Sequence, residues 1–417
     1  MPASATSKRL CLFTSALGGG GVQRSMRQLA AGLAARGYAV DLVVCHGDRE
    51  LARELAAARV NVVVLRPSWP GLGRLLAFRA DPPALRLLGP TVLWPIKTWR
   101  KLAYLAALRD HLRQRPPSGL LSAMTQCNLV ALWAHRLAGR PGRVVVSERN
   151  MLSAFISQHA GKWRWQYLAP LVAHAYRRAD AIVAVSQAVA NDLAHATGLA
   201  QTAITTAPNP VIDDVLRDDV AKARNEPSPG SHRPTALGVG RLVDQKDPMT
   251  LLRAFARVRR NRDARLVLIG EGNQRQALLD EAAALGIAED VILPGWDERP
   301  FHAMAMADVF VLASRWEGLP GVLIQALACG CPVVATDAPG GSAEILEHGR
   351  YGHLVPVGDV EAMARAIQAS LNAPGDRAAR LARAEDYSVE RATAIYAGLL
   401  DPEASTAQPL AFRSRQT

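Results

Sequence analysis

Short apolar runs alternate with amphipathic helical segments along most of the chain. The first apolar run, 10–14, leads into four consecutive glycines at 18–21, and apolar residues at helical spacing follow over 22–36. Gly37 ends this predicted helix before the next apolar run at 39–44. A strand, a glycine turn, a helix and a second strand in this order predict one unit of a parallel α/β sheet.

The same alternation continues on both sides of a polar stretch. Further strands are expected at 60–65, 144–147 and 181–185 before it, and at 235–239, 265–269, 291–293, 309–313 and 332–335 after it. The later strands are separated by predicted helices at 249–259, 274–285 and 322–329. Strands that are apolar throughout indicate parallel sheets covered on both faces. The polar stretch is acidic at first and then rich in Pro, Ser and Gly, which is typical of a linker.

A chain of 417 residues exceeds what one hydrophobic core usually organises. We therefore predict an α/β protein with two Rossmann-like, doubly wound parallel-sheet domains, at 1–212 and 235–400, joined by a linker at 213–234. Because ligands bind at the carboxyl ends of such strands, we expect the two domains to face a central cleft. The tail at 401–417 lacks periodicity and is expected to be frayed.

The net charge of +12 favours anionic partners, and the positive charge is concentrated in one segment of the chain. Between 74 and 115 the sequence has nine cations, Arg74, Arg79, Arg86, Lys97, Arg100, Lys101, Arg109, Arg113 and Arg115. Trp94, Trp99 and Tyr104 lie among them, so this segment is a candidate for peripheral contact with an anionic membrane. An ordinary helix over 96–112, packed on the first sheet, is an equal and compatible alternative. No recognised nucleic-acid module appears, so we predict no nucleic-acid partner.

The odd number of five cysteines gives no disulfide framework and no zinc knuckle. No stretch of about 18 apolar residues occurs, and the start of the chain lacks the pattern of a cleaved signal. We therefore expect a cytoplasmic protein, with the inner face of the plasma membrane as its candidate peripheral site. The sequence also has no Asp-x-Asp triple and no metal-ligand spacing, so no metal is predicted.

Two cations follow the first strand of the second domain. Arg241 and Lys246 stand five residues apart just beyond 235–239, where a planar guanidinium and a compact ammonium suit the oxygens of a diphosphate. A solvated surface pair is the alternative. The glycines at 18–21 are similarly placed to meet phosphate at a helix N-terminus, or they form only a tight turn, since they lack the dinucleotide-binding fingerprint.

The stretch 314–335 carries the most specific pattern. It reads Ser-Arg-Trp-Glu-Gly-Leu-Pro-Gly-Val-Leu-Ile-Gln-Ala-Leu-Ala-Cys-Gly-Cys-Pro-Val-Val-Ala. This resembles the signature of glycosyltransferase family 4, the group 1 glycosyl transferases of cell-surface polysaccharide synthesis. Gly-Arg-Leu-x-x-Gln-Lys at 240–246 resembles the diphosphate clamp of that family, and further pieces occur in the usual order. The resemblance covers nearly the whole chain.

The resemblance implies a GT-B fold with an acceptor-side first domain, a nucleotide-sugar-binding second domain and a retaining, metal-independent reaction. It implies that Arg241 and Lys246 bind the donor diphosphate and that Glu317 contacts the sugar hydroxyls. The predicted donor-binding set is Gly20, Gly21, Arg241, Lys246, Glu317, Gly318, Leu319 and Gln325. No cofactor is expected beyond a nucleotide-sugar donor.

Gln325 and Arg149 depart from that pattern. Gln325 occupies the place of the second Glu of the family, so an amide replaces a carboxylate where the resemblance implies contact with the ribose. Glu148 and Arg149 follow the strand at 144–147, and many relatives have His at the position of Arg149. Both are candidates to orient the acceptor or to support the transition state, and a salt bridge between them is equally open.

These observations predict transfer of a hexosyl or N-acetylhexosaminyl group from a UDP-sugar to a saccharide acceptor, one assembled on a lipid carrier, in surface glycan synthesis. Two alternatives remain. A UDP-sugar epimerase of the GT-B fold shares the two-domain plan, and Gln325 leaves open a non-catalytic scaffold that binds a nucleotide sugar.

Overall fold

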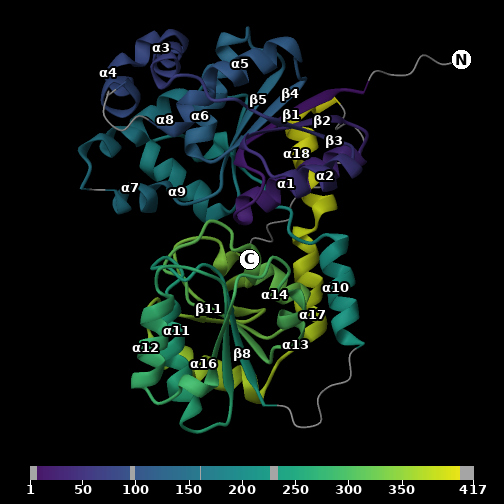
Figure 1. Cartoon of the computed structure of the whole chain (residues 1–417), viewed down its shortest axis with the longest axis vertical. Helices are drawn as coiled ribbons and strands as arrows, with labels where there is room; N and C mark the ends of the chain where they lie inside the picture. Colours follow the sequence, from purple (N-terminus) through teal and green to yellow (C-terminus); the bar gives the residue numbers. More distant parts are fainter. Residues whose placement is uncertain (1–6, 94–98, 160, 226–232, 404–417) are drawn as a thin grey trace, which may run out of the picture. The chain divides into compact units, whose positions relative to one another are not determined.

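The computed structural model describes residues 7–93, 99–159, 161–225 and 233–403, and it divides into two compact units (Figure 1). The first unit combines residues 1–210 with 389–417, and the second spans 211–388. Each unit contains one parallel sheet flanked by helices. The predicted class of two doubly wound α/β domains is thus confirmed.

The sheet of the first unit has seven strands in the order β3-β2-β1-β4-β5-β6-β7. They are β1 (Arg9–Ala16), β2 (Ala39–His46), β3 (Val60–Val64), β4 (Gly119–Ala123), β5 (Arg143–Glu148), β6 (Ala181–Ala184) and β7 (Ile204–Thr206). All neighbouring pairs run parallel. The central strand β4 was not predicted, although all five of its residues are buried. Its sequence, Gly-Leu-Leu-Ser-Ala, is too short and too poor in β-branched residues to give a strand signal.

Helices cover both faces of this sheet. The longer ones are α1 (Gly21–Ala35), α2 (Arg49–Ala57), α3 (Pro70–Ala80), α5 (Leu105–Gln114), α6 (Thr125–Leu137), α7 (Leu152–Gln158), α8 (Leu168–Tyr176), α9 (Gln187–Thr197) and α18 (Val389–Leu400). Shorter turns are η1 (Pro82–Ala84), α4 (Leu85–Leu88), η2 (Gly89–Leu93), η3 (Arg100–Tyr104), η4 (Trp163–Tyr167) and η5 (Gln201–Ala203). The apolar positions of α1, such as Met26 and Leu29, pack with Leu10 and Leu12 of β1 in the core. The helix period seen in the sequence is therefore the period of burial.

The last helix, α18, belongs to the first unit and not to the second, where the sequence had placed it by extending the second domain to residue 400. It packs against α1 and β5, and Tyr396 and Leu400 enter the first core. Gly32 marks the contact, because a Cβ there would lie 2.4 Å from Oγ1 of Thr393. Most of the predicted tail, from residue 404 on, lies outside the described residues.

The sheet of the second unit has six parallel strands in the order β10-β9-β8-β11-β12-β13. They are β8 (Thr235–Val239), β9 (Arg265–Ile269), β10 (Val291–Gly295), β11 (Val309–Leu312), β12 (Val333–Thr336) and β13 (His353–Val355). The helices are α10 (Asp214–Arg224), α11 (Pro248–Arg259), α12 (Arg275–Ala284), α13 (Phe301–Met306), α14 (Gly321–Ala328), α15 (Ser342–Ile345), α16 (Val360–Asn372) and α17 (Arg377–Ala384), with turns η6 (Ala288–Asp290), η7 (Glu347–Gly349) and η8 (Glu385–Tyr387).

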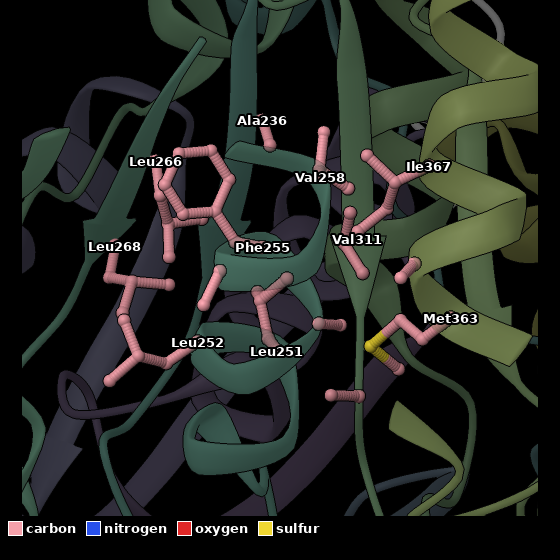
Figure 2. Packing of buried hydrophobic residues seen from close by; sticks show 14 of the residues in the cluster. Ala236, Leu251, Leu252, Phe255, Val258, Leu266, Leu268, Val311, Met363 and Ile367 are labelled. Carbon is pink, nitrogen blue, oxygen red and sulfur yellow. The ribbon is translucent and has the colours of Figure 1, made fainter. Parts of the chain in front are cut away.

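Figure 2 shows how the core of the second unit is built around α11. Phe255 and Leu252 lie among the side chains of β8 and β9, while Met363 and Ile367 of α16 close the same cluster. All four side chains are fully buried. This packing fixes the strand ends from which the loops of the second unit leave.

The predicted linker at 213–234 is partly wrong, because its first half forms α10. Asp213 caps this helix by accepting a hydrogen bond from the backbone N–H of Leu216, and α10 packs on α13 within the second unit. Arg299, just before α13, adds a bidentate ion pair with Asp219. The Pro- and Ser-rich half, 226–232, lies outside the described residues.

Two of the three aromatic residues expected at a membrane surface are not on the surface. Trp99 and Tyr104 are both buried, and the Trp99 ring stacks on Trp165 with 6.1 Å between centroids. Trp94 lies outside the described residues, as does the start of the predicted helix over 96–112. The described remainder of that helix forms η3 and α5 and packs on α6, whereas the alternative interpretation placed the helix on the first sheet.

Candidate functional site

The strand order of the second sheet contains one switch point, at the edge of the sheet where β8 and β11 end. The chain moves outward from β8 through β9 to β10, then returns to the other side of β8 to form β11. At such a switch point the loops after the two adjacent strands diverge and leave a crevice for ligands. The loop after β8, 240–247, carries Arg241 and Lys246, and the loop after β11, 313–320, carries Glu317. The sequence-predicted donor residues therefore meet at this edge.

Lys246 and Glu317 contact each other across the switch point. Nζ of Lys246 lies 2.5 Å from Oε1 of Glu317, and the same carboxylate oxygen accepts a hydrogen bond of 2.6 Å from the hydroxyl of Ser314. The Glu317 side chain is only 8% exposed and that of Lys246 19%. A cation and a carboxylate are thus held close together in the loops that follow β8 and β11, where a charged ligand can bind.

Gln245 joins the same two loops beside this pair. Its side-chain amide donates to the backbone carbonyl of Trp316 over 3.2 Å, and its backbone carbonyl accepts from the N–H of Arg315 over 2.8 Å. The Gln245 side-chain oxygen accepts a hydrogen bond of 2.9 Å from the guanidinium of Arg241, whose side chain is exposed. The hydrogen bond to Gln245 therefore orients the guanidinium of Arg241, while its exposed side can bind an anion.

Two glycines let backbone segments approach these loops closely. Gly270 has φ +146°, and a Cβ there would lie 1.9 Å from the carbonyl oxygen of Gly240. Gly340 has φ +132°, and a Cβ there would lie 2.2 Å from the carbonyl oxygen of Glu317. Any side chain at these positions would displace a loop that carries the candidate site. Gly270 and Gly340 thus allow the close backbone contacts that hold the two loops of the site in place.

The remaining predicted donor residues of this unit lie on one connected segment. Gly318 and Leu319 are buried beyond Glu317, and the Gly318 carbonyl accepts a hydrogen bond of 2.9 Å from the N–H of Gly341. Gln325 is also buried, on the second turn of α14, which starts directly after this loop. The structure brings these residues to the same edge as Glu317. Their contact with a donor stays a prediction.

The glycines at 18–21 lie at the switch point of the first sheet, between β1 and α1. Gly19 has φ +104°, and Gly20 is the N-cap of α1. A Cβ on Gly21 would meet no atom within 4 Å, so packing alone does not require glycine there. The open space and the helix N-terminus are compatible with phosphate, and donor contact by Gly20 and Gly21 stays a prediction.

Glu148 lies inside the first unit at the end of β5. Its carboxylate accepts hydrogen bonds from the Tyr176 hydroxyl, from the Thr125 hydroxyl at 3.0 Å and from the Asn128 amide at 3.3 Å. Burial raises the pKa of Glu148 from its usual 4.5 to about 7, while these hydrogen bonds lower it. The group therefore ties β5 to α6 and α8 within the unit.

This pKa predicts how stability depends on pH. Between about pH 4.5 and about pH 7 the folded state keeps the proton on Glu148 that the unfolded chain has lost, so stability falls as the pH rises. We expect Glu148→Gln to remove this loss. The free energy of unfolding of the variant, relative to that of wild type, should therefore rise by up to about 3 kcal/mol between acidic and neutral pH. Urea denaturation of both proteins from about pH 5 to pH 8 measures the difference. A difference that is constant with pH would contradict the assignment.

Arg149 is also buried, with partners from three distant segments. Its guanidinium donates to the Ser25 hydroxyl and to the Asn209 side-chain oxygen, each over 2.5 Å, and lies 5.8 Å from the ring centroid of Tyr396. These partners are α1, the segment after β7 and α18. Among the described residues no ion pair joins Arg149 to Glu148, so the salt bridge that the sequence left open is absent. Both side chains are buried within the first unit, and their role toward an acceptor stays a prediction.

Two further expectations concerned metal ligands and membrane-spanning segments. No group of three or more His, Cys, Asp or Glu side chains in the described ranges is arranged to hold a metal ion. Among the same residues, no helix has the length and apolar character needed to cross a bilayer.

Comparisons with known proteins match both units. The family model described as Glycosyltransferase Family 4 matches residues 49–215, and the one described as Glycosyl transferases group 1 matches residues 233–373. The chain belongs to glycosyltransferase family 4. The first match covers β3 to β7 of the first sheet and the second match covers the whole second sheet. The second match contains Arg241, Lys246, Glu317 and Gln325.

Curated relatives from this family act on varied substrates. The chain is 38% identical over 135 residues, 32% of its length, to an N-acetylgalactosaminyltransferase of Campylobacter jejuni whose name specifies a diphospho-undecaprenol acceptor. It is 34% identical over 228 residues, 51% of its length, to a GDP-mannose-dependent phosphatidylinositol monomannoside mannosyltransferase of Mycolicibacterium smegmatis. The chain covers 36% and 59% of these two relatives.

Solved structures share the fold of this protein over nearly its whole length. Anabaena HepE in complex with UDP-glucose aligns with a TM-score of 0.67 at 19% identity, covering 95% of this chain and 96% of that one. The lipopolysaccharide outer core galactosyltransferase WaaB aligns with the same TM-score at 16% identity, covering 95% and 99%. These likenesses confirm the GT-B fold.

Proposed function

We propose that this protein is a retaining glycosyltransferase that moves a hexosyl or N-acetylhexosaminyl group from a UDP-sugar to a saccharide acceptor carried on a lipid. The observation that carries the proposal is the contact between Lys246 and Glu317 at the switch point of the second sheet, with Arg241 beside it. Two cations and one fixed carboxylate suit a ligand that joins a diphosphate to a hydroxylated ring.

The roles of these residues follow from their charge. Arg241 and Lys246 stabilise the negative charge that develops on the departing UDP, and this is the contribution that a metal ion makes in other transferases. Glu317 accepts hydrogen bonds from hydroxyls of the donor sugar and so orients the ring. These side chains supply the cationic charge without a metal.

The reaction needs no strongly basic side chain. The bond between the anomeric carbon and the diphosphate oxygen breaks while the acceptor oxygen bonds to the same face of that carbon. The acceptor proton passes to a phosphate oxygen of the departing UDP. Configuration at the anomeric carbon is thereby retained.

The nature of the acceptor rests on the relatives. The Campylobacter relative is named for a diphospho-undecaprenol acceptor, and the mycobacterial relative for a phosphatidylinositol one. HepE was solved with UDP-glucose, which supports a UDP-sugar donor, whereas the mycobacterial enzyme is named for GDP-mannose.

The test is UDP or GDP release from a panel of UDP-sugars and GDP-mannose, with and without a membrane lipid extract. Lipid-dependent release from one UDP-sugar supports the proposal, and NMR of the product gives the anomeric configuration. Release from GDP-mannose alone would overturn the UDP assignment. An epimer formed from donor without acceptor would favour the epimerase, and binding of UDP without release from any donor would favour the scaffold.

Gln325 offers a further test of donor geometry. If this side chain meets the ribose, Gln325→Glu replaces a neutral acceptor by a charged one, and we expect KM for the donor to fall by roughly fivefold with little change in kcat. Gln368→Glu on α16, a partly buried position of the same unit, is the matched control. An unchanged KM in steady-state UDP-release assays would show that Gln325 does not contact the nucleotide.

A further inference from the structure

Exposed apolar side chains concentrate on one part of the first unit. Of the thirteen large apolar side chains that are exposed in the described ranges, seven fall within 66–86 and 162–167. They are Trp69, Leu72, Leu75, Phe78, Leu85, Trp163 and Tyr167. The two stretches are connected in space, because η4 contacts η2, and η2 contacts both α3 and α4. Figure 1 shows α3, α4 and α8 gathered on the same side of this unit. We call residues 66–86 and 162–167 the docking face.

Helix α3 is apolar on its outer side as well as its inner side. Its inner side is held against η3, since a Cβ on Gly73 would lie 2.2 Å from the carbonyl oxygen of Leu102. Its outer side presents Leu72 and Leu75 one turn apart, and Leu75 is 59% exposed. Arg74 and Arg79 are the charged residues of this helix, and a helix that combines cations with an exposed apolar side is typical of the boundary between lipid and water. No described residue of this unit covers the outer side of α3, since Leu72, Leu75 and Phe78 remain exposed.

An aromatic ring extends this apolar side at the start of α3. The Trp69 side chain is 75% exposed and lies over Gly71, where a Cβ would come within 2.1 Å of the ring. On the second stretch, Trp163 and Tyr167 pack edge to face at 6.0 Å and remain exposed. Tryptophan and tyrosine at such positions have an apolar body and a polar tip, which suits the boundary between acyl chains and headgroups.

The charge of the docking face is of one sign. It contains six cations, Arg66, Arg74, Arg79, Arg86, Lys162 and Arg164. Asp81 is the one carboxylate within these two stretches, and it is buried in an ion pair with Arg178 and a hydrogen bond with His174. The face therefore offers cations beside apolar side chains and no exposed carboxylate. That chemistry complements an anionic lipid surface better than a protein surface, where both signs of charge are usual.

We propose that residues 66–86 and 162–167 dock the protein on an anionic lipid bilayer, with α3 lying along the interface. The inference deepens the proposed function, because it identifies the surface through which the protein meets the membrane that carries the lipid-linked acceptor. It rests on the proposed function only for the presence of that acceptor. It also moves the membrane contact predicted at 74–115 away from the buried Trp99 and Tyr104.

The experiment is co-sedimentation of the full chain with vesicles of phosphatidylcholine, either alone or with about a third phosphatidylglycerol. We expect binding to the anionic vesicles, weakened when salt is raised from about 0.1 M to about 1 M. Leu75→Glu should weaken binding at least about tenfold, since it removes an inserted side chain and adds a repelled charge. Leu279→Glu on α12, where the leucine is 40% exposed, is the matched control and should bind as wild type.

Several outcomes would overturn the proposal. They are absence of vesicle binding by the wild type, equal loss in both leucine variants, or equal binding to neutral and anionic vesicles. Self-association that is lost in Leu75→Glu, without vesicle binding, would instead make the face a contact between copies of the chain. Thermal denaturation of both variants shows whether they remain folded. Vesicle binding is measured without a donor, so failure of transfer and failure of docking are distinguished.

Discussion

Lys246→Ala should lower kcat/KM for UDP release by about 100-fold or more, the usual cost of removing one preorganised stabiliser of transition-state charge. The ammonium of Lys246 lies at the switch point, 2.5 Å from the Glu317 carboxylate. Its removal takes a positive charge from the departing diphosphate. It also leaves Glu317, a buried acid, with the Ser314 hydroxyl as its described side-chain partner. Both effects act on the reacting groups, so the loss should appear mainly in kcat.

A matched variant separates this effect from a general loss of charge. Lys222→Ala removes an exposed lysine from α10 in the same unit and should leave kcat/KM unchanged. Thermal denaturation should show both variants to be folded. If Lys246→Ala retained activity within about threefold of wild type, Lys246 would not bind the leaving group, and the assignment of the site would fail.

Arg149→Ala should lower the free energy of unfolding by about 4 kcal/mol. Buried Arg149 donates to Ser25 and Asn209, so truncation removes the charged donor that they share, leaves them with the hydrogen bond between them and opens a cavity beside Tyr396. Urea denaturation followed by circular dichroism measures the change. A residue that only oriented an acceptor would give the opposite pattern, with activity lost and stability kept.

Arg53→Ala provides the comparison for this stability effect. Arg53 lies exposed on α2 in the same unit, so its removal should change the free energy of unfolding by less than about 0.5 kcal/mol. Equal stability of the Arg149→Ala protein and wild type, together with a large loss of transfer, would instead support Arg149 as an acceptor residue.

The sequence predicted the sheets well because parallel strands are buried on both faces. β8 and β9 were predicted at 235–239 and 265–269 and occur with those bounds. The same logic placed Lys246 and Glu317 at strand ends, although 71 residues separate them. Adjacent strands at a switch point bring such loops together whatever their separation in the chain.

Tertiary contacts account for what the sequence did not reveal. Arg149 follows a strand just as a ligand-binding residue would, and its partners Ser25 and Asn209 are distant in the sequence. Nothing in the local pattern separates a polar group that faces a ligand from one that faces the core. For α10 a signal existed, since buried Leu216 and Val220 follow the cap Asp213 at helical spacing. The Pro-, Ser- and Gly-rich composition after it outweighed that spacing.

Helix α18 makes the first unit discontinuous in the chain, and this affects how the protein folds during synthesis. Until Thr393 and Tyr396 leave the ribosome, the side of α1 around Gly32 lacks its cover and Arg149 lacks one of its partners. The whole second unit must be translated first, which takes on the order of ten seconds or more at the usual rate of roughly 5–20 residues per second. The first unit therefore stays incomplete until α18 has been synthesised, and a fragment that stops at residue 210 should aggregate rather than fold.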